Sequence, residues 1–280
     1  MNIGIIGQGF VGSAIREGLK NFHKVLTYDL DETKCSHTFE QVCKQSEIIF
    51  MCLPTPMRLD GSCDTRILEK AIQDLYNQDE TVKRKNKPIL VIKSTIPPTE
   101  RIASNYTDMS ICFSPEFLTE ANSFEDFKNQ TRIIIGGPRP ATGKIKQMFK
   151  RVFPTIPIVK TGAKTAEMVK YFTNCFLASK VTFANKMYDV CNSSGIDYDK
   201  VCEYALYDER IGKSHLAVPG PDGDRGFGGH CFPKDLAAMI EYGSNNEVDV
   251  SFLRSIECFN NKVRKNRDWE NMKGRAVSED

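Results

Sequence analysis

Short apolar runs alternate with amphipathic stretches along the first 160 residues of the chain. The runs are rich in Ile and Val, which is typical of strands. Strands that alternate with helical stretches predict an α/β fold with a doubly wound, mostly parallel sheet. We expect strands at residues 2–6, 24–28, 47–53, 88–92, 110–113 and 132–135, with helices near 11–20, 66–76 and 141–152.

The pattern changes after Thr161. Gly and Pro are absent from residues 163–194, and apolar residues such as Met168, Phe172, Phe176 and Met187 recur at helical spacing. This predicts one helix of about thirty residues, roughly 45 Å long, and a helix of that length crosses between domains or pairs with another copy. Shorter helices are expected near 198–206, 236–242 and 250–263.

We therefore divide the chain into an α/β domain (1–160), a region with the long helix and a small helical domain (161–265), and a polar tail (266–280). Chain ends of such polar composition are poorly ordered unless something holds them. We expect the tail to be poorly ordered.

Composition narrows the function only slightly. The chain has 280 residues with 40% hydrophobic and 26% charged residues, which is typical of a globular protein. Its formal net charge of +2 gives no electrostatic case for a nucleic-acid or membrane partner. No apolar run approaches the roughly 18 residues of a spanning helix, and the N-terminus starts as a strand rather than a leader. We expect a cytoplasmic protein.

The ten cysteines have no CxxC pair among them, and only four histidines are present. We predict no structural metal site. Several cysteines, such as Cys52 and Cys112, lie within apolar runs, so most are interpreted as buried thiols.

The first motif with chemical meaning is GQGFVG, in which Gly7, Gly9 and Gly12 follow the first strand. In G-x-G-x-x-G the second glycine lets the backbone approach a pyrophosphate at a helix N-terminus. Asp29 ends the second strand about twenty residues onward, where a carboxylate binds a ribose 2′-hydroxyl and repels a 2′-phosphate. The pattern predicts NAD rather than NADP. The alternative is a set of turn glycines without a ligand.

Three further motifs are ambiguous by themselves. The loops LPTP (Pro54, Thr55) and KSTIPP (Ser94, Thr95) follow strands, where open sheets bind ligands, but turns of this composition are common. In SPEFLTEA, two glutamates four residues apart would share one face if the segment were helical, for acid/base work or as a solvated surface.

The long helix carries Lys170 and Asn174, also four residues apart. An ammonium beside a carboxamide can stabilise an anionic oxygen. A lysine at this position can equally extend to water.

The segment GFGGHCFPKD, residues 226–235, is the most informative. Its glycines let the backbone wrap a ligand, and Cys231 lies just before a predicted helix whose N-terminus favours a thiolate. We choose Cys231 as the nucleophile, with Asp235 four residues beyond. The alternative is a buried loop thiol.

These motifs, together with DERIG around Arg210 and read in chain order, resemble the UDP-glucose/GDP-mannose dehydrogenase family, with the nearest likeness to its UDP-glucose-oxidising members. The resemblance runs from residue 1 to about 263. It implies a Rossmann-type NAD-binding domain, a long central helix that forms a homodimer core, and a second nucleotide-binding domain beyond it. We expect the chain to lack that second domain.

The resemblance implies oxidation of UDP-glucose to UDP-glucuronate by two NAD-dependent hydride transfers through a cysteine-bound intermediate. Cys231 matches the nucleophile, and Lys170 and Asn174 match the groups that stabilise the oxyanion. Asp235 works with this lysine and a water that Thr95 positions. Glu120 matches a proposed acid/base, with Glu116 beside it as support.

The implied binding residues fall into two sets. Cofactor positions are Gly7, Gly9, Phe10, Val11, Gly12, Asp29, Lys34, Leu53, Pro54, Thr55, Ser94 and Thr95. Substrate positions are Glu116, Phe117, Leu118, Lys170, Asn174, Arg210, Phe227 and Gly228, with Arg210 reaching the partner subunit's substrate.

The chain departs from the family's pattern in three places. Lys186 replaces the usual acid of FANE, STIPPTE is one residue shorter, and PGPDGDRG is longer than in many members. Two alternatives stay open: a β-hydroxyacid-type dehydrogenase, which needs no cysteine, and a non-catalytic NAD or nucleotide-sugar binder that works alone or with another chain.

Overall fold

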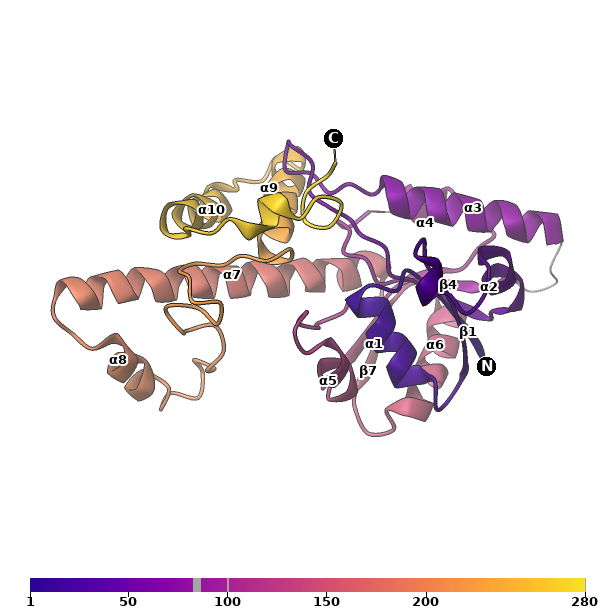
Figure 1. The fold of residues 1–280 in the computed structure, drawn as a ribbon, viewed down its shortest axis with the longest axis horizontal. Coiled ribbons are helices and arrows are strands. Elements are labelled where there is room, and N and C mark those ends of the chain that lie inside the picture. Colours follow the sequence, from indigo (N-terminus) through magenta and orange to yellow (C-terminus); the bar gives the residue numbers. More distant parts are fainter. Residues whose placement is uncertain (83–86, 100, 280) are drawn as a thin grey trace. The chain divides into compact units, whose positions relative to one another are not determined.

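The computed structural model describes residues 1–82, 87–99 and 101–279. The chain forms two compact units (Figure 1). Unit 1 comprises residues 1–55 and 65–170, and unit 2 comprises residues 56–64 and 171–280. The long helix α7 (Ala163–Ser193) begins in unit 1 and continues in unit 2.

Unit 1 is built on a seven-stranded sheet with the order β2-β1-β3-β4-β5-β6-β7. All neighbouring strands are parallel except β5 and β6. The strands are β1 (Asn2–Ile6), β2 (Lys24–Tyr28), β3 (Ile48–Met51), β4 (Ile89–Ile92), β5 (Ile111–Phe113), β6 (Ile133–Gly136) and β7 (Ile158–Thr161). The predicted α/β class with a doubly wound, mostly parallel sheet is confirmed.

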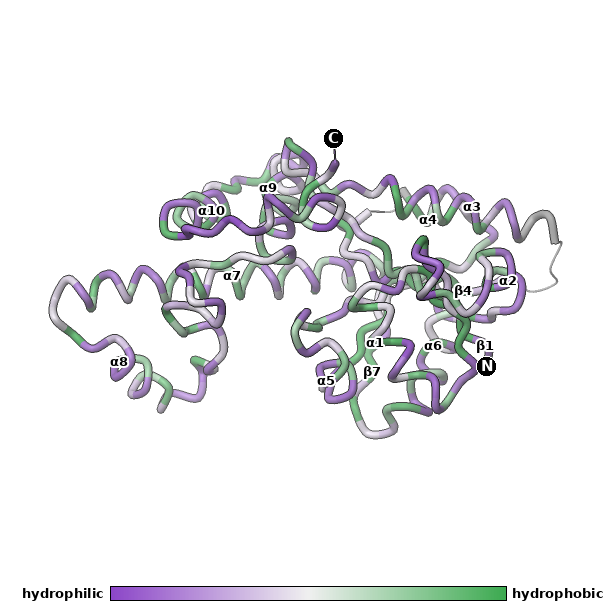
Figure 2. The backbone as a smooth tube through the Cα atoms, in the orientation of Figure 1, coloured by the Kyte–Doolittle hydropathy of each residue, from purple (hydrophilic) through white to green (hydrophobic). Residues whose placement is uncertain are grey.

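Helices cover both faces of this sheet, so its strands are apolar on both sides. Ile48 and Phe50 point into one core with α1 (Phe10–Leu19), α5 (Ser123–Lys128) and α6 (Arg139–Val152). Ile49 and Met51 point into the other, with α2 (Phe39–Gln45), α3 (Arg66–Val82) and α4 (Arg101–Ser104). Figure 2 shows hydrophobic residues concentrated on the strands.

One strand and several boundaries differ from the prediction. We expected six strands, and β7 is the seventh; it lies at the edge of the sheet, where Val159 and Lys160 are exposed, so its sequence lacks the continuous apolar run of a buried strand. The short helix α2 was also not predicted. It begins with a capping box. Thr38 Oγ1 accepts a hydrogen bond from the Gln41 backbone N–H, and Gln41 Oε1 accepts one from the Thr38 backbone N–H.

The predicted long helix is confirmed, and α7 runs for 31 residues. It is followed by α8 (Tyr198–Ala205), α9 (Phe232–Asn245) and α10 (Ser251–Val263). Helix α9 begins four residues earlier than predicted, directly after Cys231. Pro233 explains this start, because a proline in the first helical turn has no N–H to satisfy.

Residues 266–279 differ from the expected disordered tail. They contain a short 3-10 helix, Asp268–Asn271, in which Trp269 is buried, and Ala276 is buried as well. Residue 277 pairs with Met57, which in turn pairs with Cys63, so the end of the chain joins segment 56–64 in a small ladder. Ser278 Oγ donates to Asp64 Oδ2 at 2.9 Å. Contacts with residues more than 200 positions away order this polar segment.

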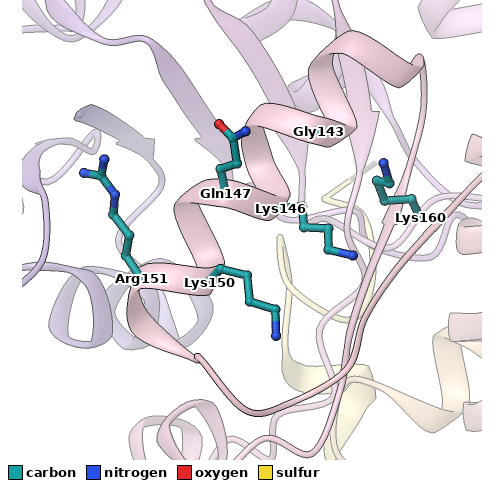
Figure 3. A pocket seen from close by; sticks show the side chains of 6 residues that line it. All are labelled: Gly143, Lys146, Gln147, Lys150, Arg151 and Lys160. Atoms are coloured by element: carbon teal, nitrogen blue, oxygen red, sulfur yellow. The ribbon is translucent and has the colours of Figure 1, made fainter.

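A hollow of about 580 Å³ lies on unit 1 over α6 and β7 (Figure 3). Its lining is mostly cationic: Gly143, Lys146, Gln147, Lys150, Arg151 and Lys160. None of the predicted site residues is among them. In the described part of the chain, no helix is long and apolar enough to cross a membrane.

Candidate active site

The turn between β1 and α1 has the geometry that its three glycines predict. Gly7 has a φ of +90°, and a Cβ there would lie 2.3 Å from the Cys52 carbonyl oxygen. A Cβ on Gly12 would lie 1.9 Å from the Gly7 carbonyl oxygen. Both positions therefore exclude any side chain. Gly9 has no atom within 4 Å of an added Cβ, so open space lies in front of the α1 N-terminus, where a pyrophosphate would bind.

Asp29 follows β2, and its carboxylate binds the backbone of this turn. Its Oδ2 accepts a hydrogen bond from the Gln8 backbone N–H at 2.5 Å, and its Oδ1 accepts from the Asp31 N–H at 2.9 Å. The acid is thus held at the turn, as binding to a ribose hydroxyl requires. Lys34, the other cofactor position of this region, pairs with Asp31 at 3.0 Å and is exposed.

The loops after β3 and β4 are bonded to each other. Leu53 N–H donates to Ser94 Oγ at 3.1 Å, Ser94 Oγ donates to the Leu53 carbonyl at 2.6 Å, and Thr55 Oγ1 donates to the Thr95 carbonyl at 2.7 Å. The parallel register of β3 and β4 brings these loops to the same edge of the sheet. The structure therefore joins two predicted motifs that the sequence separates by forty residues.

Lys170 and Glu116 form a buried ion pair in unit 1. Lys170 Nζ lies 2.7 Å from Glu116 Oε1 and 2.9 Å from the Glu116 carbonyl oxygen. The second carboxylate oxygen accepts from the Leu118 N–H at 2.7 Å. Burial alone would raise the pKa of Glu116, but Lys170 and the hydrogen bonds hold it below its usual value. The alternative in which this lysine extends to water is wrong.

The segment 114–119 is not helical, so Glu116 and Glu120 do not share a helix face. Glu116 is buried while Glu120 is exposed. Phe117 stacks under Arg132, whose guanidinium carbon lies 4.1 Å from the ring centroid, and Lys170 Nζ lies 5.9 Å from the same ring. The irregular turn follows β5, and its Glu116 carbonyl and carboxylate both bind Lys170.

Lys93 is a second buried lysine of this cluster, and the sequence did not single it out. It follows β4 directly, and its Nζ donates to the Pro115 carbonyl at 3.3 Å. Burial lowers its pKa to about 8, with Lys170 acting in the same direction. The available signal was its position: a lysine that abuts the fully buried strand ILVI has little solvent to reach.

In unit 2, the buried carboxylate of Asp235 binds two side chains. Asn174 Nδ2 donates to its Oδ2, and Lys234 Nζ lies 2.5 Å from its Oδ1. Burial alone would lower the pKa of Lys234, but Asp235, followed by Cys231 and Cys63, keeps it above its ordinary value. Lys234 was not predicted, although it lies between two residues that were.

Cys231 occupies the N-cap position of α9 and is half-buried. Its carbonyl accepts from the Asp235 N–H at 3.0 Å, which closes the first turn of the helix. The thiol therefore lies at a helix N-terminus, with the Lys234 ammonium among its electrostatic neighbours. Both features favour a thiolate. The alternative of a fully buried loop thiol is wrong.

The glycine loop before Cys231 is held by residues from α7, α10 and the end of the chain. Asn185 Oδ1 accepts from the Gly226 N–H at 3.2 Å, and Asn260 bonds both the N–H and the carbonyl of Phe227. Asp268 accepts from the Gly229 N–H at 3.1 Å.

Gly228 has no room for a side chain, since a Cβ would lie 2.2 Å from Arg264 Nη2. Arg264 itself is buried and pairs with Asp222 in the long PGPDGDRG loop at 2.5 Å. No local sequence pattern predicted the residues that support this loop.

Arg210 and Lys186 are both exposed. Arg210 has 88% of its side chain exposed and pairs with Asp208 at 2.5 Å. Lys186, the departure from the family's acid, is exposed on α7, with its ammonium 5.9 Å from the centroid of the Phe259 ring. Among the residues described, no group of three or more His, Cys, Asp or Glu side chains is arranged to hold a metal ion.

The sheet, the glycine turn and the acid after β2 define a Rossmann-type dinucleotide-binding protein, continued by a long helix and helical segments. Residues 33–156 match the UDP-glucose/GDP-mannose dehydrogenase family, NAD binding domain, and residues 164–262 match the central domain of the same family. The chain belongs to this family and carries its NAD-binding domain.

Similar proteins agree with this assignment. UDP-glucose 6-dehydrogenase YwqF of Bacillus subtilis is 30% identical, over 93% of this chain and 66% of its own length. UDP-glucose 6-dehydrogenase AglM of Haloferax volcanii is 30% identical, over 86% of this chain and 65% of its own length. The chain thus spans just under two thirds of these relatives.

Solved structures show the same fold. A UDP-glucose dehydrogenase from Pyrobaculum islandicum superimposes with a TM-score of 0.85 at 26% identity, over 93% of this chain and 68% of that chain. A 3-hydroxyisobutyrate dehydrogenase from Mycobacterium tuberculosis reaches a TM-score of 0.74 at 14% identity, over 93% of this chain and 92% of that chain. The second likeness concerns the fold alone.

Proposed function

We propose that this protein oxidises the 6-hydroxymethyl group of a nucleotide sugar, with UDP-glucose as the leading substrate and UDP-glucuronate as the product. The observation that carries the proposal is Cys231 at the N-terminus of α9, beside Lys234 and Asp235. A hydroxy-acid dehydrogenase needs no such thiol. The family and the relatives named UDP-glucose 6-dehydrogenase support the same substrate class.

NAD, held by the Gly7–Gly12 turn and Asp29, supplies the acceptor for each of two hydrides when it is bound. The chain's own residues do the remaining work. Loss of the first hydride from the 6-hydroxymethyl carbon, and of its hydroxyl proton to a base, leaves an aldehyde. The Cys231 thiolate adds to the carbonyl carbon of this aldehyde, forming a C–S bond, and the oxygen takes up a proton to give a thiohemiacetal. Loss of the second hydride and of the hydroxyl proton leaves a thioester, and water then cleaves the C–S bond, so that a carboxylate leaves and the thiol returns.

Charged and polar side chains stabilise the oxygen that becomes negative in these steps. We assign this role to Lys170 and Asn174, one turn apart on α7. Asp235 would orient Asn174 and, with Thr95, the hydrolytic water, and Glu120 would act as acid and base. Phe227, Gly228 and the exposed Arg210 are assigned to substrate binding, Arg210 to that of the partner subunit.

A homodimer through α7 is part of the proposal. Five apolar side chains of α7 are between 37% and 70% exposed and recur at helical spacing: Met168, Phe172, Phe176, Phe183 and Val190. A stripe of this kind in water is typical of an interface. The hydropathy colouring of Figure 2 alternates along the whole of α7. Cytoplasmic location stays a prediction.

The test is the stoichiometry of NADH. Incubation with NAD and a panel of UDP- and GDP-sugars should give two NADH per sugar oxidised and a uronate detectable by mass spectrometry. NAD binding without oxidation of any sugar nucleotide would instead indicate a non-catalytic or partner-dependent binder. Turnover of a hydroxy acid that survives Cys231→Ser would indicate a β-hydroxyacid-type dehydrogenase.

A further inference from the structure

Two buried lysines hold consecutive carbonyl groups of one turn. Lys93 donates to the carbonyl of Pro115, and Lys170 donates to the carbonyl of Glu116. The lysines come from different elements, the end of β4 and the start of α7. Both side chains and Glu116 are buried, with 7% exposure or less. The turn that presents Glu116 to Lys170 is therefore anchored on both sides.

The charges of this cluster do not balance. Among the residues that the structure describes, it holds two ammonium groups and one carboxylate, and that carboxylate binds Lys170 and the Leu118 N–H. A carbonyl dipole offsets only part of the free-energy cost of burying a full charge. The titratable groups that act on Lys93 are Cys52, Glu116 and Lys170.

Cys52 does not supply the missing negative charge. Its thiol lies near Lys93 at the end of β3, and burial raises the pKa of this thiol to about 12. It is therefore neutral at physiological pH. The cluster retains an excess of positive charge next to Lys170 whenever Lys93 is protonated.

We propose that Lys93 is a positioning residue for Lys170, because it fixes the turn that carries Glu116 and adds a second positive charge close to the Lys170 ammonium. The inference rests on the proposed function, in which Lys170 binds an oxygen that becomes negative. A fixed positive charge in a buried site stabilises such an oxygen more than it would in water. No proton has to leave Lys93 for this role.

Two substitutions separate the effect of the hydrogen bond to the Pro115 carbonyl from the effect of the positive charge on Lys93. Lys93→Gln keeps an N–H donor for the Pro115 carbonyl but removes the charge, whereas Lys93→Met removes both. Lys44→Met is the matched control, because Lys44 is an exposed lysine on α2 that pairs with Glu40. Circular dichroism and NAD affinity identify variants that fold, and Lys93→Gln carries the test if Lys93→Met does not.

The first readout does not require turnover. In protein labelled with ¹³C at lysine Cε, the Lys93 signal, assigned with Lys93→Gln, should titrate about one pH unit higher in Lys170→Met than in the wild type, because a like charge has been removed. Lys44→Met should leave it unchanged. An unshifted Lys93 titration in a folded Lys170→Met protein would overturn the electrostatic part of the proposal.

The second readout is kinetic. Lys93→Gln should lower kcat by about tenfold below pH 8 and abolish the decline of kcat that loss of the Lys93 proton causes in the wild type above about pH 8, while KM for the sugar nucleotide changes less than about threefold. Lys93→Met should lower kcat further because the anchor is lost as well. Wild-type kcat and pH profile in both variants would overturn the proposal. If the wild type oxidises no sugar nucleotide, the proposed function fails, and the NMR titration still decides the coupling of the two lysines.

Discussion

Asn174 on α7 donates a hydrogen bond to Asp235 on α9, with 2.5 Å between Nδ2 and Oδ2. The other oxygen of this carboxylate pairs with Lys234. One buried carboxylate therefore connects helix α7 with helix α9, which begins directly after Cys231. In the proposed mechanism, stability and chemistry would depend on the same group in unit 2.

Asp235→Asn should destabilise the protein by about 3–5 kcal/mol, because it leaves the buried Lys234 ammonium without its carboxylate. Urea unfolding measures the effect. The double variant Lys234→Met with Asp235→Asn removes the orphaned charge and should recover most of the loss. A single variant as stable as the wild type would contradict the ion pair.

Gly9→Ala and Gly12→Ala should impair different properties, the first NAD binding and the second stability. Gly12→Ala places a methyl group 1.9 Å from the Gly7 carbonyl oxygen and should unfold the turn, lowering the thermal midpoint. Gly9→Ala meets nothing within 4 Å, so the protein should keep its midpoint but bind NAD at least about tenfold more weakly, since the methyl group occupies the space of the pyrophosphate. Calorimetry measures both quantities. Unchanged NAD affinity in Gly9→Ala would place the cofactor elsewhere.

Glu167→Gln should change the pH dependence of stability. Burial raises the pKa of Glu167 to about 7, although Thr99 N–H donates to it at 3.1 Å. The folded state thus binds the proton more tightly than the unfolded state, and stability is lost as pH rises from about 4.5 to 7. The Gln variant should lack this loss and be more stable than the wild type by about 1–3 kcal/mol above pH 7. Glu203→Gln, on the exposed face of α8, is the control.

Cys231→Ser should reduce the formation of two NADH per sugar nucleotide by at least about a thousandfold, because a serine hydroxyl at this position is not ionised and cannot hold the aldehyde. Cys258→Ser should be as active as the wild type, since Cys258 is exposed on α10. Mass spectrometry of the protein trapped during turnover should find the sugar on the peptide that contains Cys231. A sugar attached to any other cysteine would contradict the assignment of Cys231 as the nucleophile.

Phe183→Asp should convert the proposed dimer into a monomer. Phe183 is 64% exposed on α7, and a carboxylate in the middle of an apolar interface costs several kcal/mol of association energy. Sedimentation equilibrium measures the mass. Phe252→Asp, at a residue 66% exposed on α10, should leave the mass unchanged. A monomeric wild type would remove the dimer from the proposal.

Much of the fold could be predicted from the sequence because apolar runs, glycines and helical spacing are local signals. The six predicted strands and α7 belong to this class. Strand β7 does not, because an edge strand with exposed Val159 and Lys160 has no apolar run to recognise. The order of residues 266–279 depends on Met57, Asp64 and the glycine loop, which are distant in the chain.

The candidate site divides in the same way. Gly12, Asp29, Lys170, Asn174 and Cys231 belong to recognisable motifs. Lys93 and Lys234 were not predicted, because lysines are ordinarily solvent-exposed and only the fold buries these two. The supports of the glycine loop, such as Asn260, could not be found because an asparagine that bonds a backbone 33 residues away has no local signature.

Segment 56–64 gives the molecule an unusual connectivity. The chain passes from one unit to the other after residue 55, returns after residue 64 and passes over again after residue 170. A single cut anywhere in the chain therefore cannot release both units whole. A fragment of residues 1–170 would contain 56–64 without the ladder partner at Val277, and a fragment of residues 171–280 would have lost that segment. Dissection of this protein into separately folded pieces would require a rearranged gene in which 56–64 is excised from the first unit and joined to the second.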